Sequence, residues 1–326
     1  MKPQTLITES NLWKRVKIFI DRIPGLAIWL VVAALMVLAR LISASFWDPT
    51  HLLNVLRQAS GLGILTLGQT LVIITGGIDL SNGMVVTLVD VLAAGILKGK
   101  DTLLVPVLLL TIGLGTMIGL INGLLITKVK IPPLVCTLGM FGILKGIAYI
   151  YTGGAPKGDV PPSLKFIGEG FVGPVPTQVF FLLGFFILIY LIIHKTPYGR
   201  KIYAVGGNIR AAHHSGINTD RIIISVYMIS SILAALTGLI LAGYIGTGSL
   251  KIGDGLNFNS VAAAVVGGTI FSGGIGSVFG GMGGALFLAI LISMLRFLGL
   301  PYENQLMVQG VILAIAIYAQ SRSNKE

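Results

Sequence analysis

A polar, glycine-rich break divides a long apolar stretch in the first third of the chain. It runs TGGIDLSN over 75–82 and sets a carboxylate, a hydroxyl and an amide between two apolar runs. At membrane depth, irregular backbone and ionisable groups are tolerated only where they are buried in protein or line a cavity. A polar substrate pathway is one interpretation, and capping of the next helix by Asp79 or Ser81 is an equally weighted alternative. The candidate pathway residues here are Thr75, Gly76, Gly77, Asp79, Ser81 and Asn82.

Two basic residues lie deep within other apolar runs. Arg40 and Arg296 can extend their charged groups to the outer membrane surface, whereas Arg57 and Lys145 lie deeper and do so less easily. Arg57 and Lys145 therefore join the candidate pathway residues, where they would line an outer vestibule. Hydrogen bonding between helices is the alternative for both.

The polar segment 195–221 contains the signals of a short helix outside the membrane. Asn208 is a favourable N-cap, the residues from Ile209 to Ser215 can form two turns, and Gly216 suits the left-handed position after a helix. Small residues flanked by positive charge suit a helix that enters a groove on a partner. A helix that rests on lipid headgroups is the alternative. The candidate contact residues are Asn208, Arg210, Ala211, Ala212, His213 and Gly216.

Signatures of catalysis and metal binding are missing from the sequence. It contains no Walker A pattern, no nucleophile elbow and no HExxH motif. The single cysteine, Cys136, excludes an internal disulfide and a cysteine metal cluster. His213 and His214 are adjacent, so on a helix they point about 100° apart and cannot hold one ion together. We predict no enzyme activity, no cofactor and no metal site, so any ATP hydrolysis has to come from another subunit.

The composition indicates an α-helical membrane protein. Hydrophobic residues make up 54% of the 326 residues, charged residues 11%, and the mean hydropathy is +0.91; soluble domains have about 25% charged residues. The apolar runs lack the alternation of a transmembrane β-strand, so helices have to satisfy the backbone. We expect an all-α polytopic protein with eight to ten spans, preferably ten, some broken or re-entrant. The candidate spans are 24–43, 53–75, 80–97, 102–127, 133–151, 178–194, 222–246, 258–274, 278–299 and 303–320.

The distribution of basic residues predicts the orientation of these spans. With the N-terminus inside, 14 of the 23 lysines and arginines fall in inner segments and 5 in outer segments, as the positive-inside rule requires. Both termini are therefore predicted to be cytoplasmic, with a cytoplasmic segment 1–22 and a cytoplasmic loop 195–221 in a single domain, 1–326. The net charge of +11 gathers in these short loops, which favours membrane lipid as the neighbour and argues against nucleic acid.

Two glycine-rich stretches of the chain resemble each other. GQT (68–70) followed by TGGI (75–78) is similar to GGT (267–269) followed by SGGI (272–275). Both would lie near the inner ends of spans that run inward, which indicates a parallel repeat of the kind found in transporters with broken helices. Chance similarity is the alternative, because the chain has 44 glycines.

Four longer stretches, in order along the chain, resemble the ribose/xylose/arabinose-type permease subunits of bacterial ABC sugar importers. They are GQTLVIITGGIDLSNG (68–83), NGLLITKVKIPPLVCTLGM (122–140) with LKGIAYIYTGG (144–154), YGRKIYAVGGNIRAAHHSGIN (198–218) and VAAAVVGGTIFSGGIGSVFGG (261–281). The resemblance implies a multi-pass permease subunit of the bacterial cell (inner) membrane that translocates a small sugar. It also implies a second permease subunit in a homodimer or heterodimer, ABC ATPase subunits and an extracytoplasmic sugar-binding protein.

Within this resemblance, Arg210-Ala211-Ala212 followed by Gly216 is similar to the loop that couples such permeases to the ATPase. The family pattern usually has glutamate where Arg210 stands, and its downstream Ile-x-Leu-Pro is absent from this chain. The alternative from another class is an ion-coupled secondary transporter or channel that acts without an ATPase. Asp79 and Asp90 would be the only carboxylates within spans that it could use as a relay. The particular sugar or related solute stays open.

Overall fold

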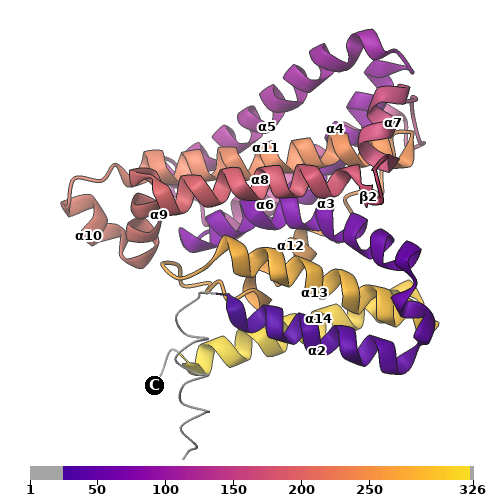
Figure 1. Ribbon diagram of the computed structural model, residues 1–326. Coiled ribbons are helices and arrows are strands. Elements are labelled where there is room, and N and C mark those ends of the chain that lie inside the picture. Colours follow the sequence, from indigo (N-terminus) through magenta and orange to yellow (C-terminus); the bar gives the residue numbers. More distant parts are fainter. Residues whose placement is uncertain (1–24, 324–326) are drawn as a thin grey trace, which may run out of the picture.

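The computed structural model describes residues 25–323 and shows a bundle of long helices that run back and forth between two ends (Figure 1). The cytoplasmic segment predicted for 1–22 lies outside the described residues. The described part contains ten longer apolar helices at the ten predicted places. They are α2 (Leu26–Ile42), α3 (Pro49–Ile74), α4 (Asn82–Leu97), α5 (Leu104–Thr127), α6 (Pro133–Thr152), α8 (Thr177–Lys195), α11 (Thr219–Ile245), α12 (Leu256–Val266), α13 (Val278–Phe297) and α14 (Tyr302–Ser323).

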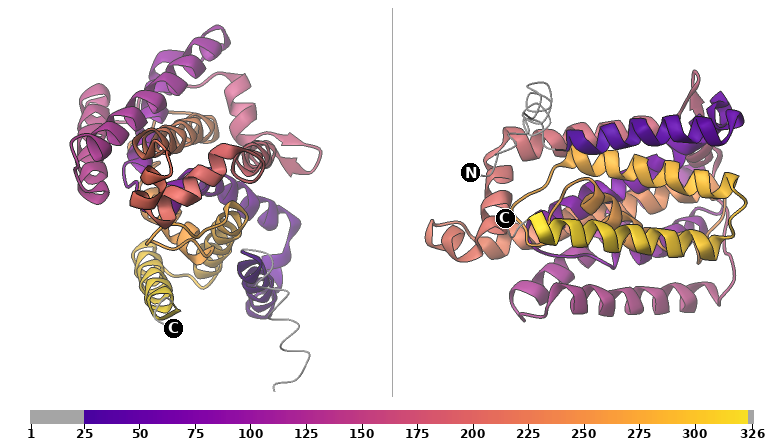
Figure 2. Two further views of the ribbon diagram at one scale, coloured as in Figure 1. Left: turned by 90° about the vertical axis from the view of Figure 1, so that its left-hand side faces the viewer. Right: turned by 90° about the horizontal axis from the view of Figure 1, so that it is seen from below.

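Shorter elements gather at the two ends of the bundle. One end, here called the inner end, carries α9 (Pro197–Gly207) and α10 (Ile209–His214), together with the start of α2 and the finish of α14 (Figure 2). The opposite, outer end carries the 3-10 turns η1 (Ala44–Trp47) and η2 (Asp101–Leu103), the helix α7 (Pro162–Glu169) and a hairpin of β1 (Phe171–Val172) and β2 (Val175–Pro176). The strands are antiparallel, with Phe171 opposite Pro176. The described chain thus enters and leaves the bundle at one end, as predicted.

Local sequence explains where several helices begin. Asp48 precedes Pro49, the first residue of α3, and its carboxylate accepts a hydrogen bond from the Thr50 N–H at 2.8 Å. Asn218 caps α11 by accepting from the Arg221 N–H at 3.0 Å, and α11 ends at Gly246, whose φ of 84° suits glycine.

The two helices next to the glycine-rich breaks are short. α4 has 16 residues and α12 only 11, about 16 Å of helix, so neither is long enough to cross a 30 Å hydrocarbon core alone. The span predicted over 258–274 was wrong in its extent, because α12 ends at Val266 and 267–277 is irregular. An added Cβ on Gly267 would collide with the Gly280 backbone of α13, so close packing requires glycine at the position where the helix ends. The prediction of broken helices is confirmed.

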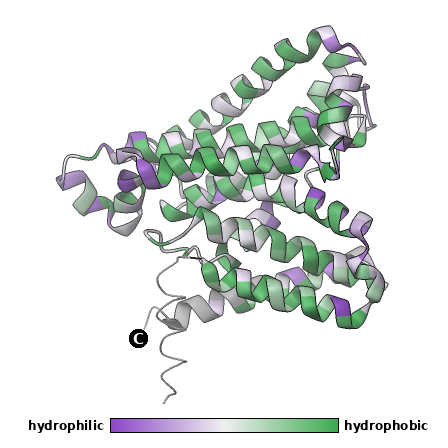
Figure 3. Cartoon of the chain, viewed as in Figure 1, coloured by the Kyte–Doolittle hydropathy of each residue, from purple (hydrophilic) through white to green (hydrophobic). Residues whose placement is uncertain are grey.

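Within residues 25–323, five helices are long and apolar enough to cross a membrane by length and composition, namely Asp101–Thr127, Pro133–Thr152, Thr177–Lys195, Thr219–Ile245 and Val278–Phe297. The first three have only 22–28% of their most apolar windows buried, whereas the last two have 61% and 67%. Peripheral helices α5, α6 and α8 therefore present apolar side chains outward, as hydropathy colouring shows (Figure 3). Such a surface requires lipid.

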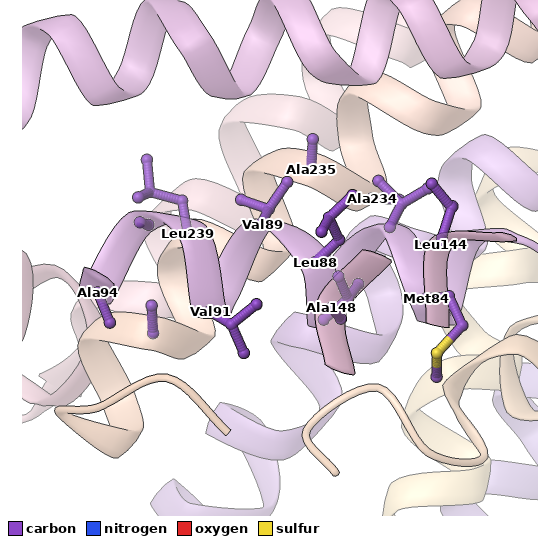
Figure 4. Close-up of a cluster of buried hydrophobic side chains, with 14 of the residues drawn as sticks. Met84, Leu88, Val89, Val91, Ala94, Leu144, Ala148, Ala234, Ala235 and Leu239 are labelled. Atoms are coloured by element: carbon purple, nitrogen blue, oxygen red, sulfur yellow. The ribbon is translucent and has the colours of Figure 1, made fainter. Parts of the chain in front are cut away.

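Helix α11 lies at the centre and packs against α3, α4, α5 and α7. Three glycines of α5, Gly115, Gly119 and Gly123, face its backbone so closely that an added Cβ would collide with it. This spacing of four residues lets two helices approach without intervening side chains. Ala234, Ala235 and Leu239 of α11 also join residues of α4 and α6 in the largest apolar cluster of the described residues (Figure 4).

Candidate coupling and translocation sites

The predicted short helix is present as α10, which projects from the inner end (Figure 1). The Asn208 side chain accepts a hydrogen bond from the Ala211 N–H at 3.0 Å, and Gly216 follows the helix with φ of 81°. Both capping signals thus act as the sequence indicates.

Only part of α10 is free for a partner. Arg210, Ala211 and His213 are exposed, whereas Ala212 is 4% exposed and packs into an apolar cluster of the bundle. The two small residues therefore have different roles, since Ala212 attaches the helix and Ala211 lies on its open face. The rings of His213 and His214 meet edge to face, with centroids 6.0 Å apart. Among the described residues, no cluster suits a metal ion.

A basic hollow of about 640 Å³ lies between α10 and the turn after α5. Lys128, Lys130 and Arg210 line it, with Asp220 as the acidic residue among its lining. Lys128 Nζ and Asp220 Oδ2 are 2.7 Å apart, so this acidic charge is already paired. The hollow therefore offers a net positive surface beside the exposed face of α10.

Three glycine pairs meet where α9 joins the bundle, and we call them the glycine junction. They are Gly76-Gly77 after α3, Gly206-Gly207 at the end of α9, and Gly273-Gly274 in the loop before α13. The Gly274 N–H donates to the Ile74 carbonyl at 2.8 Å, and a Cβ on Gly273 would lie 2.8 Å from the Gly206 oxygen. The two similar stretches of sequence thus lie side by side, with α9 packed against both.

A tyrosine side chain bonds α9 to the loop before α13. The Tyr203 hydroxyl donates to the Gly276 carbonyl at 2.9 Å. Burial raises the pKa of this phenol above its ordinary value, which keeps it a neutral donor. Helix α9 is therefore held to the bundle by side-chain as well as backbone contacts.

Asp79 lies at the centre of a buried polar network. Its Oδ1 accepts from the Ser81 N–H at 2.9 Å and from the Ser81 hydroxyl at 2.6 Å, while Oδ2 accepts from the Ser230 hydroxyl of α11 at 3.2 Å. Asn122 of α5 donates to the Ser81 hydroxyl at 3.0 Å. The carboxylate thus fixes the turn before α4 to two neighbouring helices.

Asn82 extends the network to the second broken helix. Its amide donates to the Ser260 hydroxyl of α12 at 3.0 Å, and its buried Oδ1 has no hydrogen-bond partner in the described part of the chain. Asp79, Ser81 and Asn82 are all fully buried. Their hydrogen bonds hold the irregular segment in place, although the side chain of Ser81, the N-cap residue of α4, makes no capping hydrogen bond. Their role in a pathway stays a prediction.

The remaining predicted pathway residues lie in three other places. Thr75, Gly76 and Gly77 line a cavity of about 250 Å³ at the inner end, together with Tyr227. Arg57 lines a separate cavity of about 300 Å³ near the outer end. Lys145 is exposed on α6, with its Nζ 5.9 Å from the centre of the Phe141 ring, and lines neither of these cavities. The structure does not bring Arg57 and Lys145 together.

Sequence reasoning missed several residues that these sites use. Gly206 and Gly207 stand directly before the Asn208 cap, and a glycine pair at that place is a signal of close backbone packing. Gln305 and Gln309 are one turn apart in an apolar helix and are almost fully buried. Their spacing indicates one polar helix face, which could have been recognised.

The fold and the sites define a multi-pass helical membrane protein with broken helices and a protruding inner helix, as suits a transport permease. The chain belongs to the family described as branched-chain amino acid transport system / permease component, whose model matches residues 51–317. It is 36% identical to the ribose import permease protein RbsC of Bacillus subtilis, over 97% of this chain and 98% of that protein. No solved structure matches the chain.

Other curated relatives agree in class. RbsC of Escherichia coli K12 is 34% identical over 89% of this chain and 92% of its own. The galactose/methyl galactoside import permease protein MglC of the same strain is 31% identical over 85% and 89%. The resemblance to ribose-type ABC sugar permeases is confirmed, and the chain is a multi-pass protein of the bacterial cell (inner) membrane.

Proposed function

We propose that the chain is the translocating subunit of an ABC importer for a small sugar. An extracytoplasmic binding protein delivers the sugar, a second permease subunit completes the pathway, and a separate ATPase docks on α10. The names of the ribose and galactose permeases support a sugar as the substrate class. The observation that carries the coupling role is the geometry of α9 and α10, an exposed capped helix held to the bundle through backbone contacts.

The glycine junction can transmit a movement of α10 to the rest of the bundle. An ATPase that displaces α10 also displaces α9, because Asn208 alone separates the two helices. Since Gly206 touches the Ile74 carbonyl and Tyr203 is bonded to Gly276, α9 would move the end of α3 and the loop before α13 together. These segments lead to α4 and adjoin α12, the broken helices. Their joint movement would open the inner end of the pathway.

The charge of the docking face predicts the charge of its partner. The basic hollow beside α10 complements an acidic surface on the ATPase, and such complementarity governs association and register. Arg210→Glu should weaken the co-purification of the ATPase and lower sugar uptake by about tenfold, because a favourable contact becomes repulsive. Uptake of D-ribose and D-galactose by proteoliposomes with the complete complex is the measurement.

Lys201→Glu is the matched control, since Lys201 is exposed on α9 and the charge change is identical. It should leave both readouts close to those of the unmodified chain. Equal losses for the two variants would show that only overall charge matters. Normal uptake by Arg210→Glu would contradict docking on α10.

A further inference from the structure

The outer cavity, about 300 Å³, lies at the end of the bundle opposite α10. Arg57 of α3, Gln178 at the start of α8, Tyr244 at the end of α11 and Arg296 at the end of α13 line it. Helix α14 closes another side with Gln309. Its volume is at the lower limit of about 300–1,000 Å³ for small-molecule sites, so it suits a single small ligand.

Helix α14 turns its polar side toward this cavity. Gln305 and Gln309 are only 5% and 8% exposed, whereas Met307 and Val311 of the same helix are 70% and 58% exposed. A helix that follows the apolar rule of soluble proteins would bury the opposite face. Gln305 Nε2 donates to the Leu300 carbonyl at 2.9 Å, and the Gln309 amide lines the cavity beside it. Buried amides are usually hydrogen-bonded, so a polar occupant suits this side of the cavity.

Two buried polar atoms at the cavity have no hydrogen-bond partner within the described structure. One is Gln178 Oε1; Gln178 itself is 1% exposed, and its Nε2 donates to the Gly168 carbonyl at 2.6 Å. The other is Nε of Arg57, whose Nη2 donates to the Glu169 carbonyl at 3.0 Å. One hydrogen bond thus holds each side chain in place. Gln178 keeps an unsatisfied acceptor, Oε1, and Arg57 keeps an unsatisfied donor, Nε.

The chemistry of the lining matches a neutral polyhydroxy compound. Amides both donate and accept hydrogen bonds, as sugar hydroxyls do. Arg296 already donates to Gln58 Oε1 at 2.9 Å, and Asp254 adds a negative charge to the lining. The Arg57 guanidinium lies 5.6 Å from the centre of the Tyr244 ring and 4.8 Å from that of Phe171. Arg296 is therefore engaged, and Arg57 keeps its Nε without a partner among the described residues, which leaves the amides as the main contacts for a ligand.

We propose that the outer cavity binds one neutral monosaccharide within this chain, so that the permease itself, and not only a binding protein, recognises the sugar. Gln178 and Gln309 contribute hydrogen bonds, and Tyr244 offers an apolar face. The inference rests on the proposed function for its substrate class. The description of the matching family names branched-chain amino acids, whose apolar side chains offer the lining amides no hydrogen bond, whereas the hydroxyls of a sugar do.

Direct binding by the full chain in lipid nanodiscs, with no ATPase or binding protein, tests the proposal. The probes are radiolabelled D-ribose, D-xylose, D-galactose and D-glucose, with L-leucine for comparison. At least one sugar should bind saturably, and Gln178→Leu and Gln309→Leu should each weaken its binding by about tenfold. Asn304→Leu, an exposed site on the same helix, should change nothing. Saturable binding of leucine alone, or of no probe, would overturn the proposal.

A labelling experiment covers the case in which a leucine variant fails to fold. The native chain has one cysteine, Cys136, which is buried. In Gln309→Cys the bound sugar should slow modification by a water-soluble maleimide, whereas in Asn304→Cys it should not. Equal rates with and without sugar in both variants would refute the site. Uptake by the complete complex is measured in parallel: normal uptake without binding rejects only this site, and absent uptake rejects the proposed function.

Discussion

At the residue scale, Asp79 is the position where the pathway and capping interpretations can be separated. Its carboxylate accepts three hydrogen bonds from Ser81 and Ser230 and has no basic side chain among those partners. If it acts through these bonds, Asp79→Asn should keep much of the structure, because a serine hydroxyl can rotate and accept from the new amide. If it relays an ion, the neutral amide should be as inactive as alanine.

We expect Asp79→Asn to retain measurable uptake and Asp79→Ala to lose it. In the alanine variant two buried hydroxyl donors and one N–H donor lose the carboxylate that accepts from them, at about 1–3 kcal/mol each. Thermal unfolding in detergent and uptake by the complete complex are the measurements. Asp159→Asn is the control, because its exposed pair with Lys165 contributes at most about 1 kcal/mol. Equal loss of uptake in the asparagine and alanine variants, with normal thermal stability, would favour the ion-coupled alternative.

At the element scale, the glycine junction makes α9 the mechanical link of the chain. An alanine at Gly206 would place its Cβ against the Ile74 carbonyl, where no flexible side chain can give way. We expect Gly206→Ala to separate α9 from α3, at about 1–3 kcal/mol of overpacking. Uptake should fall while the ATPase still co-purifies, because the exposed face of α10 is untouched.

Gly142→Ala is the matched control, since an added Cβ on this α6 residue meets no atom within 4 Å. ATP hydrolysis, sugar uptake and ATPase co-purification are measured together for both variants. Hydrolysis without transport in Gly206→Ala alone is the expected signature of lost coupling. Unchanged transport would show that α9 moves independently of the end of α3.

At the scale of the whole molecule, local sequence patterns predicted the helices. Tertiary contacts determined where some helices end and which residues lie together. The ten helices and the capped α10 followed from apolar runs and from Asn208 and Gly216. The end of α12 did not follow from them, because the close contact of Gly267 with the Gly280 backbone joins residues that are distant in the sequence. The separation of Arg57 from Lys145 could not be predicted either. Hydropathy places both residues at a similar depth in the membrane but does not show which face of its helix each one occupies. The similarity of 75–78 to 272–275 was visible in the sequence, whereas their contact through α9 was not.

The same scale yields a prediction about the source of energy. The described part of the chain holds two fully buried carboxylates, Asp79 and Asp90. Asp79 accepts hydrogen bonds from Ser81 and Ser230, whereas Asp90 accepts one from the Ser249 N–H and keeps its Oδ1 without a partner among the described residues. A relay that moves ions across the membrane needs ionisable groups along the whole path, and two carboxylates do not supply them. The purified chain alone, in proteoliposomes with proton and sodium gradients, should therefore not concentrate D-ribose or D-galactose.

Adding the ATPase, the binding protein and ATP to the same proteoliposomes should start sugar uptake, and collapse of the ion gradients should not stop it. Accumulation by the chain alone, lost on collapse of a gradient, would instead identify an ion-coupled transporter.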